Sequence, residues 1–342
     1  MRAAVMRKGR LVVETVPDPE PGPGEVLVRT LACGICGSDL HALEHADALV
    51  AAAREAAMPF TMDPGRDVVM GHEFCAEVVD FGPDTARAHP TGTRVVSMPL
   101  AMGTAGVEAV GYSNDYPGGY GELMRLSEPF LLAVPNGLAT EHAALTEPMA
   151  VGVHAVAKAR LVPGDAPLVI GCGPVGLAVI AALRLRGAEP IVAADFSPTR
   201  RALAERMGAH VVVDPAVQRP IDAWEAAAGA RPAVVFECVG VPGLLDAIMR
   251  DAPRGARVVV AGVCMEDDRI RPLLGINKEL SVQFVLGYTP DEFADTLRDI
   301  GEGRIPVAPL VTGRVGVDGV PDAFRTLARP DAHAKLLVEP WR

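Results

Sequence analysis

What the sequence lacks excludes several classes of protein. It has no cluster of basic residues, and its 32 Lys and Arg stand against 43 Asp and Glu, which gives a formal net charge of -11 at pH 7. Phosphate backbones are bound by basic stripes, and this acidic chain of 342 residues offers none. We therefore expect no nucleic acid among its partners.

Long apolar runs are also lacking. The one uncharged stretch with the length of a membrane span, 166–183 (APLVIGCGPVGLAVIAAL), has three glycines and a proline in its middle. The first residues, MRAAVMRKGRLVVETV, show neither the sustained apolar core nor the small-residue cleavage site of a secretory signal. We expect no membrane segment, and we expect the protein in the cytoplasm.

Cysteine is scarce and scattered. The six cysteines stand at positions 33, 36, 75, 172, 238 and 264. In a long chain without an export signal, this pattern argues against a disulfide framework. We expect reduced thiols or metal ligands, and the four cysteines beyond position 36 are typical of small buried apolar side chains.

The chain changes character near residue 150. Before it, short β-rich runs such as 25–30 and 94–97 are separated by Gly/Pro turns, with one alanine-rich helical stretch at 45–57 inside a loop. After it, apolar strand-like runs alternate with helical stretches, which is typical of a parallel sheet covered on both faces. The sequence therefore predicts the α/β class, with a doubly wound sheet following a mostly β domain.

Helix-start signals support this pattern, and one of them marks a domain boundary near 289. Ser197 followed by proline is a typical N-cap, and Thr289 with Glu292 has the form of a capping box directly after the last predicted strand. We divide the chain into 1–148, a parallel-sheet domain at 149–288, and a C-terminal segment at 289–342.

A GxGxxG sequence follows the first strand of the second domain and opens a helix, the context in which this motif binds dinucleotides. The candidate cofactor-binding residues of this turn are Gly171, Gly173, Pro174, Val175 and Gly176. Gly171 permits a tight turn, Gly173 lets the backbone approach a pyrophosphate, and Gly176 lets the helix pack against the strand. The positive end of the helix favours the phosphate charge.

Asp195, 19 residues after Gly176, ends the next predicted strand. Its carboxylate would accept hydrogen bonds from the adenosine ribose and repel a 2′-phosphate, so NAD is favoured over NADP. Arg200 and Arg201 lie near enough to pair with a 2′-phosphate, and this keeps NADP open.

The stretch CGICGSDLH at 33–41 gathers two thiols, a hydroxyl, a carboxylate and an imidazole. Together with GHE at 71–73 and Glu147, it could supply the three protein ligands of a catalytic zinc. A structural zinc would more often show two CxxC pairs, and only one such pair exists here. A redox CxxC would precede a helix in its own βαβ unit, whereas this one follows a β-rich segment.

These motifs resemble those of the zinc-dependent alcohol and polyol dehydrogenases of the medium-chain dehydrogenase/reductase superfamily. GICGSD-x-H, GHE, a Glu-Pro segment and GxGxxG occur in the family's order and at compatible spacing over essentially the whole chain. The resemblance implies a GroES-like catalytic domain formed from both chain ends, with a Rossmann domain inserted between them. It also implies hydride transfer between an alcohol and a nicotinamide cofactor.

The resemblance assigns the metal ligands residue by residue. Cys36 matches the thiolate ligand, His72 the imidazole ligand, and Glu147 the third ligand, which is a carboxylate in the polyol branch. Glu73 matches an acid that approaches the metal, and we expect it to bind only transiently, because a second carboxylate would make zinc a weaker Lewis acid. Cys33 is not a ligand in this pattern.

The remaining residues of the motif match a proton route. Asp39 corresponds to the carboxylate that orients the ligand histidine. Ser38 and His41 correspond to the groups that carry the alcohol proton to the surface, and a histidine suits the last step because its pKa is ordinarily near neutral. Without the resemblance, Ser38 could be a turn residue, Asp39 a helix cap and His41 an exposed imidazole.

Two departures from the family pattern are visible. Residues 97–118 contain no cysteine where many members bind a structural zinc with four, so we expect one zinc per chain. The connection at 42–70 is longer than usual in the family, and it either shapes the substrate site, with Phe60, or is a surface excursion.

The function that the sequence favours is NAD-dependent oxidation of a secondary alcohol or polyol. The alternatives are a zinc-free reductase that reduces activated double bonds with NADPH, and a non-catalytic nucleotide-binding protein. The matched ligands and Asp195 argue against the first, and the presence of every matched site residue argues against the second. By resemblance we also expect a homodimer or homotetramer, paired through the strand near 280–286.

Overall fold

The computed structural model describes residues 1–58, 62–103, 106–329 and 333–342. The chain forms two compact units: unit 1 contains 1–147 and 311–342, and unit 2 contains 148–310. The predicted return to the first domain at 289 differs from this division, because residues 289–310 fall in unit 2. Helix α9 (Pro290–Gly301) contacts α3 (Thr146–Lys158) through Glu292 and His154, whose side chains lie 2.7 Å apart.

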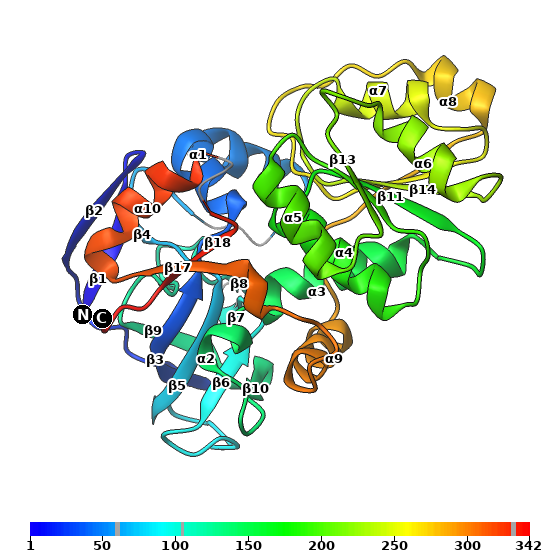
Figure 1. Ribbon diagram of the computed structural model, residues 1–342. Helices are drawn as coiled ribbons and strands as arrows, with labels where there is room; N and C mark the ends of the chain where they lie inside the picture. Colours follow the sequence, from blue (N-terminus) through cyan, green and yellow to red (C-terminus); the bar gives the residue numbers. More distant parts are fainter. Residues whose placement is uncertain (59–61, 104–105, 330–332) are drawn as a thin grey trace. The chain divides into compact units, whose positions relative to one another are not determined.

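Unit 1 is mostly β and is built from both ends of the chain (Figure 1). Its strands are β1 (Arg2–Arg7), β2 (Arg10–Thr15), β3 (Glu25–Gly34), β4 (Val68–Val69), β5 (Glu73–Phe81), β6 (Arg94–Ser97), β7 (Leu100–Gly103), β8 (Gly106–Ala109), β9 (Leu123–Ser127), β10 (Leu131–Ala133), β17 (Val311–Val315) and β18 (Lys335–Val338). The main sheet has the order β10-β6-β5-β3-β18-β17, with β9 also paired to β3. Strand β18 therefore brings the C-terminal segment directly beside β3, which leads into the CGICGSDLH motif.

The helices of unit 1 are α1 (Gly37–Glu55), α2 (Thr140–Ala143) and α10 (Val320–Leu327), with 3-10 turns η1 (Glu128–Phe130) and η3 (Val317–Gly319). The predicted short helix at 45–57 is present as the second part of α1, which continues from a kink at His45 to Glu55; the helical stretch before the kink, which begins at Gly37, was not predicted. Asp39, at the third position of the helix, accepts a hydrogen bond from the backbone N–H of Cys36, and this reciprocal cap starts the helix early.

Unit 2 contains the predicted parallel sheet, in the order β13-β12-β11-β14-β15-β16. Its strands are β11 (Ala166–Ile170), β12 (Val192–Ala194), β13 (Val211–Val213), β14 (Ala233–Glu237), β15 (Arg257–Val260) and β16 (Ser281–Phe284). Besides α3 and α9, its helices are α4 (Pro174–Leu185), α5 (Pro198–Met207), α6 (Pro220–Ala228), α7 (Leu244–Asp251) and α8 (Pro272–Lys278), with a 3-10 turn η2 (Ala308–Leu310). The strand order reverses between β11 and β14, where ligands bind in open α/β sheets.

The predicted helix starts are confirmed. The hydroxyl of Ser197 accepts a hydrogen bond from the N–H of Arg200, and Thr289 and Glu292 form a reciprocal capping box. A search of the described residues finds no helix that combines the length and apolar character needed to cross a membrane.

Candidate metal centre and dinucleotide site

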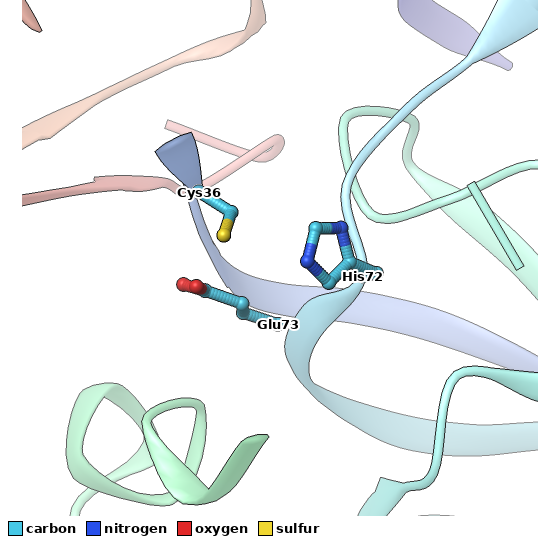
Figure 2. Close-up of side chains that lie close together, drawn as sticks. All are labelled: Cys36, His72 and Glu73. Carbon is cyan, nitrogen blue, oxygen red and sulfur yellow. The ribbon is translucent and has the colours of Figure 1, made fainter. Parts of the chain in front are cut away.

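Cys36, His72 and Glu73 meet where β3 ends and β5 begins. A ligand atom of each lies within 4.8 Å of the others, and among the described residues they form the one group of three or more Cys, His, Asp and Glu side chains this close together. Figure 2 shows the thiol of Cys36 and a ring nitrogen of His72 facing the same space, with the Glu73 carboxylate beside them. Thiolate, imidazole and carboxylate are the donors that zinc prefers, so these residues fit that metal.

The backbone brings these side chains together through strand pairing. Gly34 is the partner of Glu73 in the antiparallel β3–β5 ladder, and Cys36 follows two residues later as the N-cap of α1. A Cβ atom at Gly34 would lie 2.1 Å from Oε2 of Glu73. A glycine at position 34 therefore leaves the space that the Glu73 carboxylate occupies.

Asp39 lies behind His72 in a fully buried position. Its Oδ1 is 3.3 Å from Nδ1 of His72, and its Oδ2 accepts hydrogen bonds from the hydroxyl of Tyr120 at 2.6 Å and from the N–H of Cys36 at 3.0 Å. Burial alone would raise the pKa of Asp39, but the charge of His72 and these hydrogen bonds hold it below its ordinary value. An ionised Asp39 can orient the imidazole, as expected for a carboxylate behind a metal-binding histidine.

Glu73 has a partner that the sequence analysis missed. The ammonium group of Lys335 in β18 donates hydrogen bonds to both carboxylate oxygens, at 2.6 and 2.7 Å, and to the carbonyl of Ile35 at 3.1 Å. Both side chains are buried, with exposed fractions of 3% and 0%. Burial lowers the pKa of Lys335, but the charges of Glu73, Cys36 and Glu147 raise it above its ordinary value.

The other predicted residues of unit 1 lie near this group but outside it. Glu147 is half-buried at the start of α3, near enough for its charge to act on Lys335. Ser38 and His41 lie in the first turns of α1, three residues apart and so on the same helix face. Cys33 is buried, and burial raises the pKa of its thiol well above the ordinary value, so it remains protonated.

The candidate dinucleotide site lies in unit 2, at the turn from β11 into α4. Gly171 has a φ of +91°, and a Cβ at Gly176 would lie 1.8 Å from the carbonyl oxygen of Gly171, so the turn itself requires both glycines. A Cβ at Gly173, the N-cap of α4, would meet only Nη1 of Arg200, at 3.9 Å. Space is therefore left at Gly173 for an approaching pyrophosphate, and Pro174 and Val175 begin the helix there.

Asp195 follows β12, and its carboxylate accepts hydrogen bonds from two backbone N–H groups at and beside this turn. Its Oδ2 accepts a hydrogen bond of 2.7 Å from the N–H of Cys172, and its Oδ1 accepts one of 2.8 Å from the N–H of Ser197. Nη1 of Arg200 lies 4.0 Å from Oδ2, whereas Arg201 pairs with Asp214 at 3.0 Å. Of the two arginines near Asp195, Arg200 is the one beside the glycine turn.

Three residues that contact the site were not predicted from the sequence, although each has a recognisable sequence feature. Lys335 interrupts the apolar C-terminal run AKLLVEP, and a lone charge in a buried strand needs a buried partner. Tyr112 and Tyr120 contact Asp39, and three of the four tyrosines of the chain fall at positions 112, 116 and 120. Two of these three tyrosines, Tyr112 and Tyr120, therefore contribute to the site.

Two family models match the chain. Residues 22–136 match the alcohol dehydrogenase GroES-like domain, and residues 174–302 match the zinc-binding dehydrogenase domain. Among curated proteins, (R,R)-butanediol dehydrogenase of Bacillus subtilis (strain 168) is 33% identical, with 96% of each chain covered. Sorbitol dehydrogenase of the same organism is 28% identical over 100% of this chain and 98% of that protein.

Solved structures give the same likeness. The crystal structure of 2R,3R-butanediol dehydrogenase from Bacillus subtilis superposes with a TM-score of 0.84 at 31% identity, covering 99% of both chains. A zinc-binding dehydrogenase from Sinorhizobium meliloti 1021, described as bound to NADP, superposes with a TM-score of 0.83 at 28% identity, again over 99% of both chains.

Proposed function

The chain belongs to the zinc-dependent alcohol and polyol dehydrogenases of the medium-chain dehydrogenase/reductase superfamily, and from this premise we propose that it oxidises a vicinal diol or sugar alcohol with NAD. The observation that carries the proposal is the grouping of Cys36, His72 and Glu73, with Ser38 in the first turn of the helix that Cys36 caps. The similarity to butanediol and sorbitol dehydrogenases supports this substrate class.

Zinc is held, in this proposal, by Cys36, His72 and Glu147. When bound, it withdraws electron density from the alcohol oxygen and eases loss of the proton. Lys335 supports the choice of Glu147, because it already neutralises Glu73 through both oxygens. Glu73 is then outside the permanent ligand set and approaches the metal only transiently. A zinc ion with one thiolate and one carboxylate ligand carries no formal net charge.

The residues around the metal move the proton and fix the ligands. Ser38 takes the proton of the substrate hydroxyl as it gives its own hydrogen to His41, one helical turn further along α1, and His41 passes that proton to solvent. Asp39 fixes the orientation of the His72 imidazole. The hydride goes to the nicotinamide, whose chemistry the cofactor supplies.

NAD, rather than NADP, is the proposed cofactor. The support is Asp195, a carboxylate nine-tenths buried beside the glycine turn, where it would repel a 2′-phosphate. Arg200 is the residue that could reverse this preference. Michaelis constants for the two cofactors decide the matter: a lower value for NADP would overturn the choice of NAD.

Metal content and activity together test the function. Mass spectrometry after mild dialysis should find one zinc per chain, and the protein should reduce NAD with butane-2,3-diol or sorbitol. Cys36→Ser should lose both zinc and activity, whereas Cys33→Ala, a matched change three residues away, should keep the zinc. Two zinc ions per chain would contradict the absence of a structural zinc.

Two results would overturn the proposal itself. One is protein that carries no zinc when purified without chelators. The other is oxidation of NADPH with an enone, in protein that oxidises no alcohol, which would indicate the zinc-free reductase.

Strand β16 supports the proposal of a homodimer or homotetramer. It is the edge strand of the parallel sheet, and Val282 and Phe284 on it are 38% and 64% exposed, as is Leu286 just beyond at 64%. An exposed apolar edge strand offers unpaired backbone groups to a second copy. Light scattering that finds a monomer would contradict this.

A further inference from the structure

Tyr112 joins the proposed proton route to the carboxylate behind His72. Its hydroxyl oxygen lies 2.9 Å from Oγ of Ser38 and 3.0 Å from Oδ1 of Asp39, and its side chain is 5% exposed. Its ring lies against that of His72, with centroids 5.3 Å apart. Tyr112 comes from the segment between β8 and β9, where the sequence has no cysteine.

The number of hydrogens limits what this hydroxyl can do. A tyrosine hydroxyl has one hydrogen to donate, and an ionised carboxylate can only accept. When the hydrogen of Tyr112 points to Asp39, Ser38 can donate its own hydrogen to the tyrosine oxygen and keep its lone pairs for another donor. When it points to Ser38, the hydrogen of Ser38 is released for another acceptor.

These two arrangements match the two states of the substrate oxygen. Before proton transfer the alcohol donates a hydrogen bond, and Ser38 must accept it. After transfer the oxygen is negatively charged, and Ser38 must donate to it. Both partners lie within hydrogen-bond distance of the Tyr112 oxygen, at 2.9 and 3.0 Å, so its one hydrogen can point to either of them.

We propose that Tyr112 is a positioning residue that switches Ser38 between hydrogen-bond acceptor and donor as the substrate hydroxyl loses its proton. This inference rests on the proposed function. No net proton remains on Tyr112 or Asp39. Once Tyr112 points its own hydrogen to Ser38, the hydrogen of Ser38 is no longer bound to the tyrosine oxygen and passes to His41. The O–H bond of the alcohol breaks in the same step, and Ser38 takes that proton and then donates it in a hydrogen bond to the substrate oxygen.

Tyr120 provides a matched comparison. Its hydroxyl also donates to Asp39, at Oδ2 with a distance of 2.6 Å, but its second contact is the carbonyl oxygen of Gly34, at 3.4 Å, rather than Ser38. Tyr112→Phe and Tyr120→Phe therefore each remove one hydrogen bond to Asp39, and Tyr112→Phe additionally removes the contact with Ser38.

The experiment is a pair of double-mutant cycles with Ser38→Ala. We expect Tyr112→Phe to lower kcat about tenfold, the effect of one lost hydrogen bond, with less than about a twofold change in KM. In the Ser38→Ala background Tyr112→Phe should add almost nothing, because its action goes through Ser38. Tyr120→Phe and Ser38→Ala should have additive effects.

Two readouts do not depend on steady-state turnover. Stopped-flow proton release, followed with a pH indicator, should slow in Tyr112→Phe. Zinc content and the visible spectrum of the cobalt-substituted protein should match the wild type, because the ligands are unchanged. Loss of metal in Tyr112→Phe would mean that it acts on His72 through Asp39, and would overturn the inference.

The remaining outcomes distinguish a failure of this inference from a failure of the proposed function on which it rests. Two results with an active wild type would overturn only the role of Tyr112. One is that Tyr112→Phe and Ser38→Ala have additive effects; the other is that Tyr112→Phe leaves kcat unchanged. If no alcohol that is tested supports reduction of NAD by the wild type, the proposed function is wrong, and the inference that rests on it is wrong too.

Discussion

At the scale of single residues, the buried pair of Glu73 and Lys335 determines how much charge the metal centre must balance. Removing one partner of such a pair leaves an uncompensated buried charge. Lys335→Met should therefore lower the free energy of unfolding by about 3–5 kcal/mol, measured by urea denaturation followed by circular dichroism. The paired side chains are 3% and 0% exposed, so solvent cannot substitute for the lost ammonium group.

The double variant separates charge from packing. Glu73→Leu combined with Lys335→Met removes both charges and should recover most of the lost stability. Arg254→Met is the surface control, because Arg254 and its partner Glu279 are both about two-thirds exposed and such pairs contribute little. A single variant as stable as the wild type would contradict the contribution of this pair to stability.

At the scale of elements, the start of α9 links a helix cap to an ion pair. Glu292 accepts a hydrogen bond from the N–H of Thr289 and pairs with His154 on α3. Burial raises the pKa of Glu292, but these two partners together lower it below the ordinary value. The stabilisation is therefore present above the unfolded pKa near 4.5 and is lost as the pH falls through the lower folded pKa.

Glu292→Gln isolates the charge, since glutamine can keep the capping bond. At pH 7 the variant should melt roughly 2–4 °C below the wild type, as expected for about 1 kcal/mol. The gap should close as the pH is lowered from 5 to 3, because the wild type then loses the same charge. A gap that stays constant over this range would show that the ion pair contributes nothing.

The segment 97–118 is held without cysteine. The hydroxyl of Tyr116 donates to Oε1 of the buried Glu25 at 2.7 Å, and the guanidinium of Arg125 lies 4.3 Å from the centre of the tyrosine ring. Tyr116→Phe leaves the carboxylate oxygen without this donor, which costs about 1–3 kcal/mol. We expect faster proteolysis within 97–118 in this variant, and no change in the wild type when a chelator is added. Chelator-induced cleavage there would indicate a metal in the segment.

At the scale of the whole molecule, the parts of the fold that repeat a local rule were predictable. The parallel sheet, the glycine turn before α4 and the caps at Ser197 and Thr289 follow from short sequence patterns, and all are present. The convergence of Cys36 and His72 was anticipated only by resemblance, since no spacing rule joins positions 36 residues apart.

Long-range partners could not be read from the sequence. Lys335 reaches Glu73 because β18 pairs with β3, which in turn pairs with β5, and the two side chains that meet are 262 positions apart. The helical stretch before the kink at His45 was missed because a capping cysteine is not a common helix signal. The boundary at 311 was missed because local patterns do not encode contacts between distant segments, such as the one between His154 and Glu292.

The division into two units predicts that the ADP-ribose part of NAD binds independently of zinc. Residues of unit 2 alone form the glycine turn and Asp195, and residues of unit 1 alone form the group around Cys36. ADP-ribose, the part of NAD that the turn and Asp195 would contact, should therefore bind metal-stripped protein with a Kd within about twofold of the zinc-loaded value, a difference below about 0.5 kcal/mol. Isothermal titration calorimetry measures both values. Asp195→Asn is the control and should weaken binding equally with and without zinc, whereas loss of ADP-ribose binding on metal removal would show that the metal organises unit 2 as well.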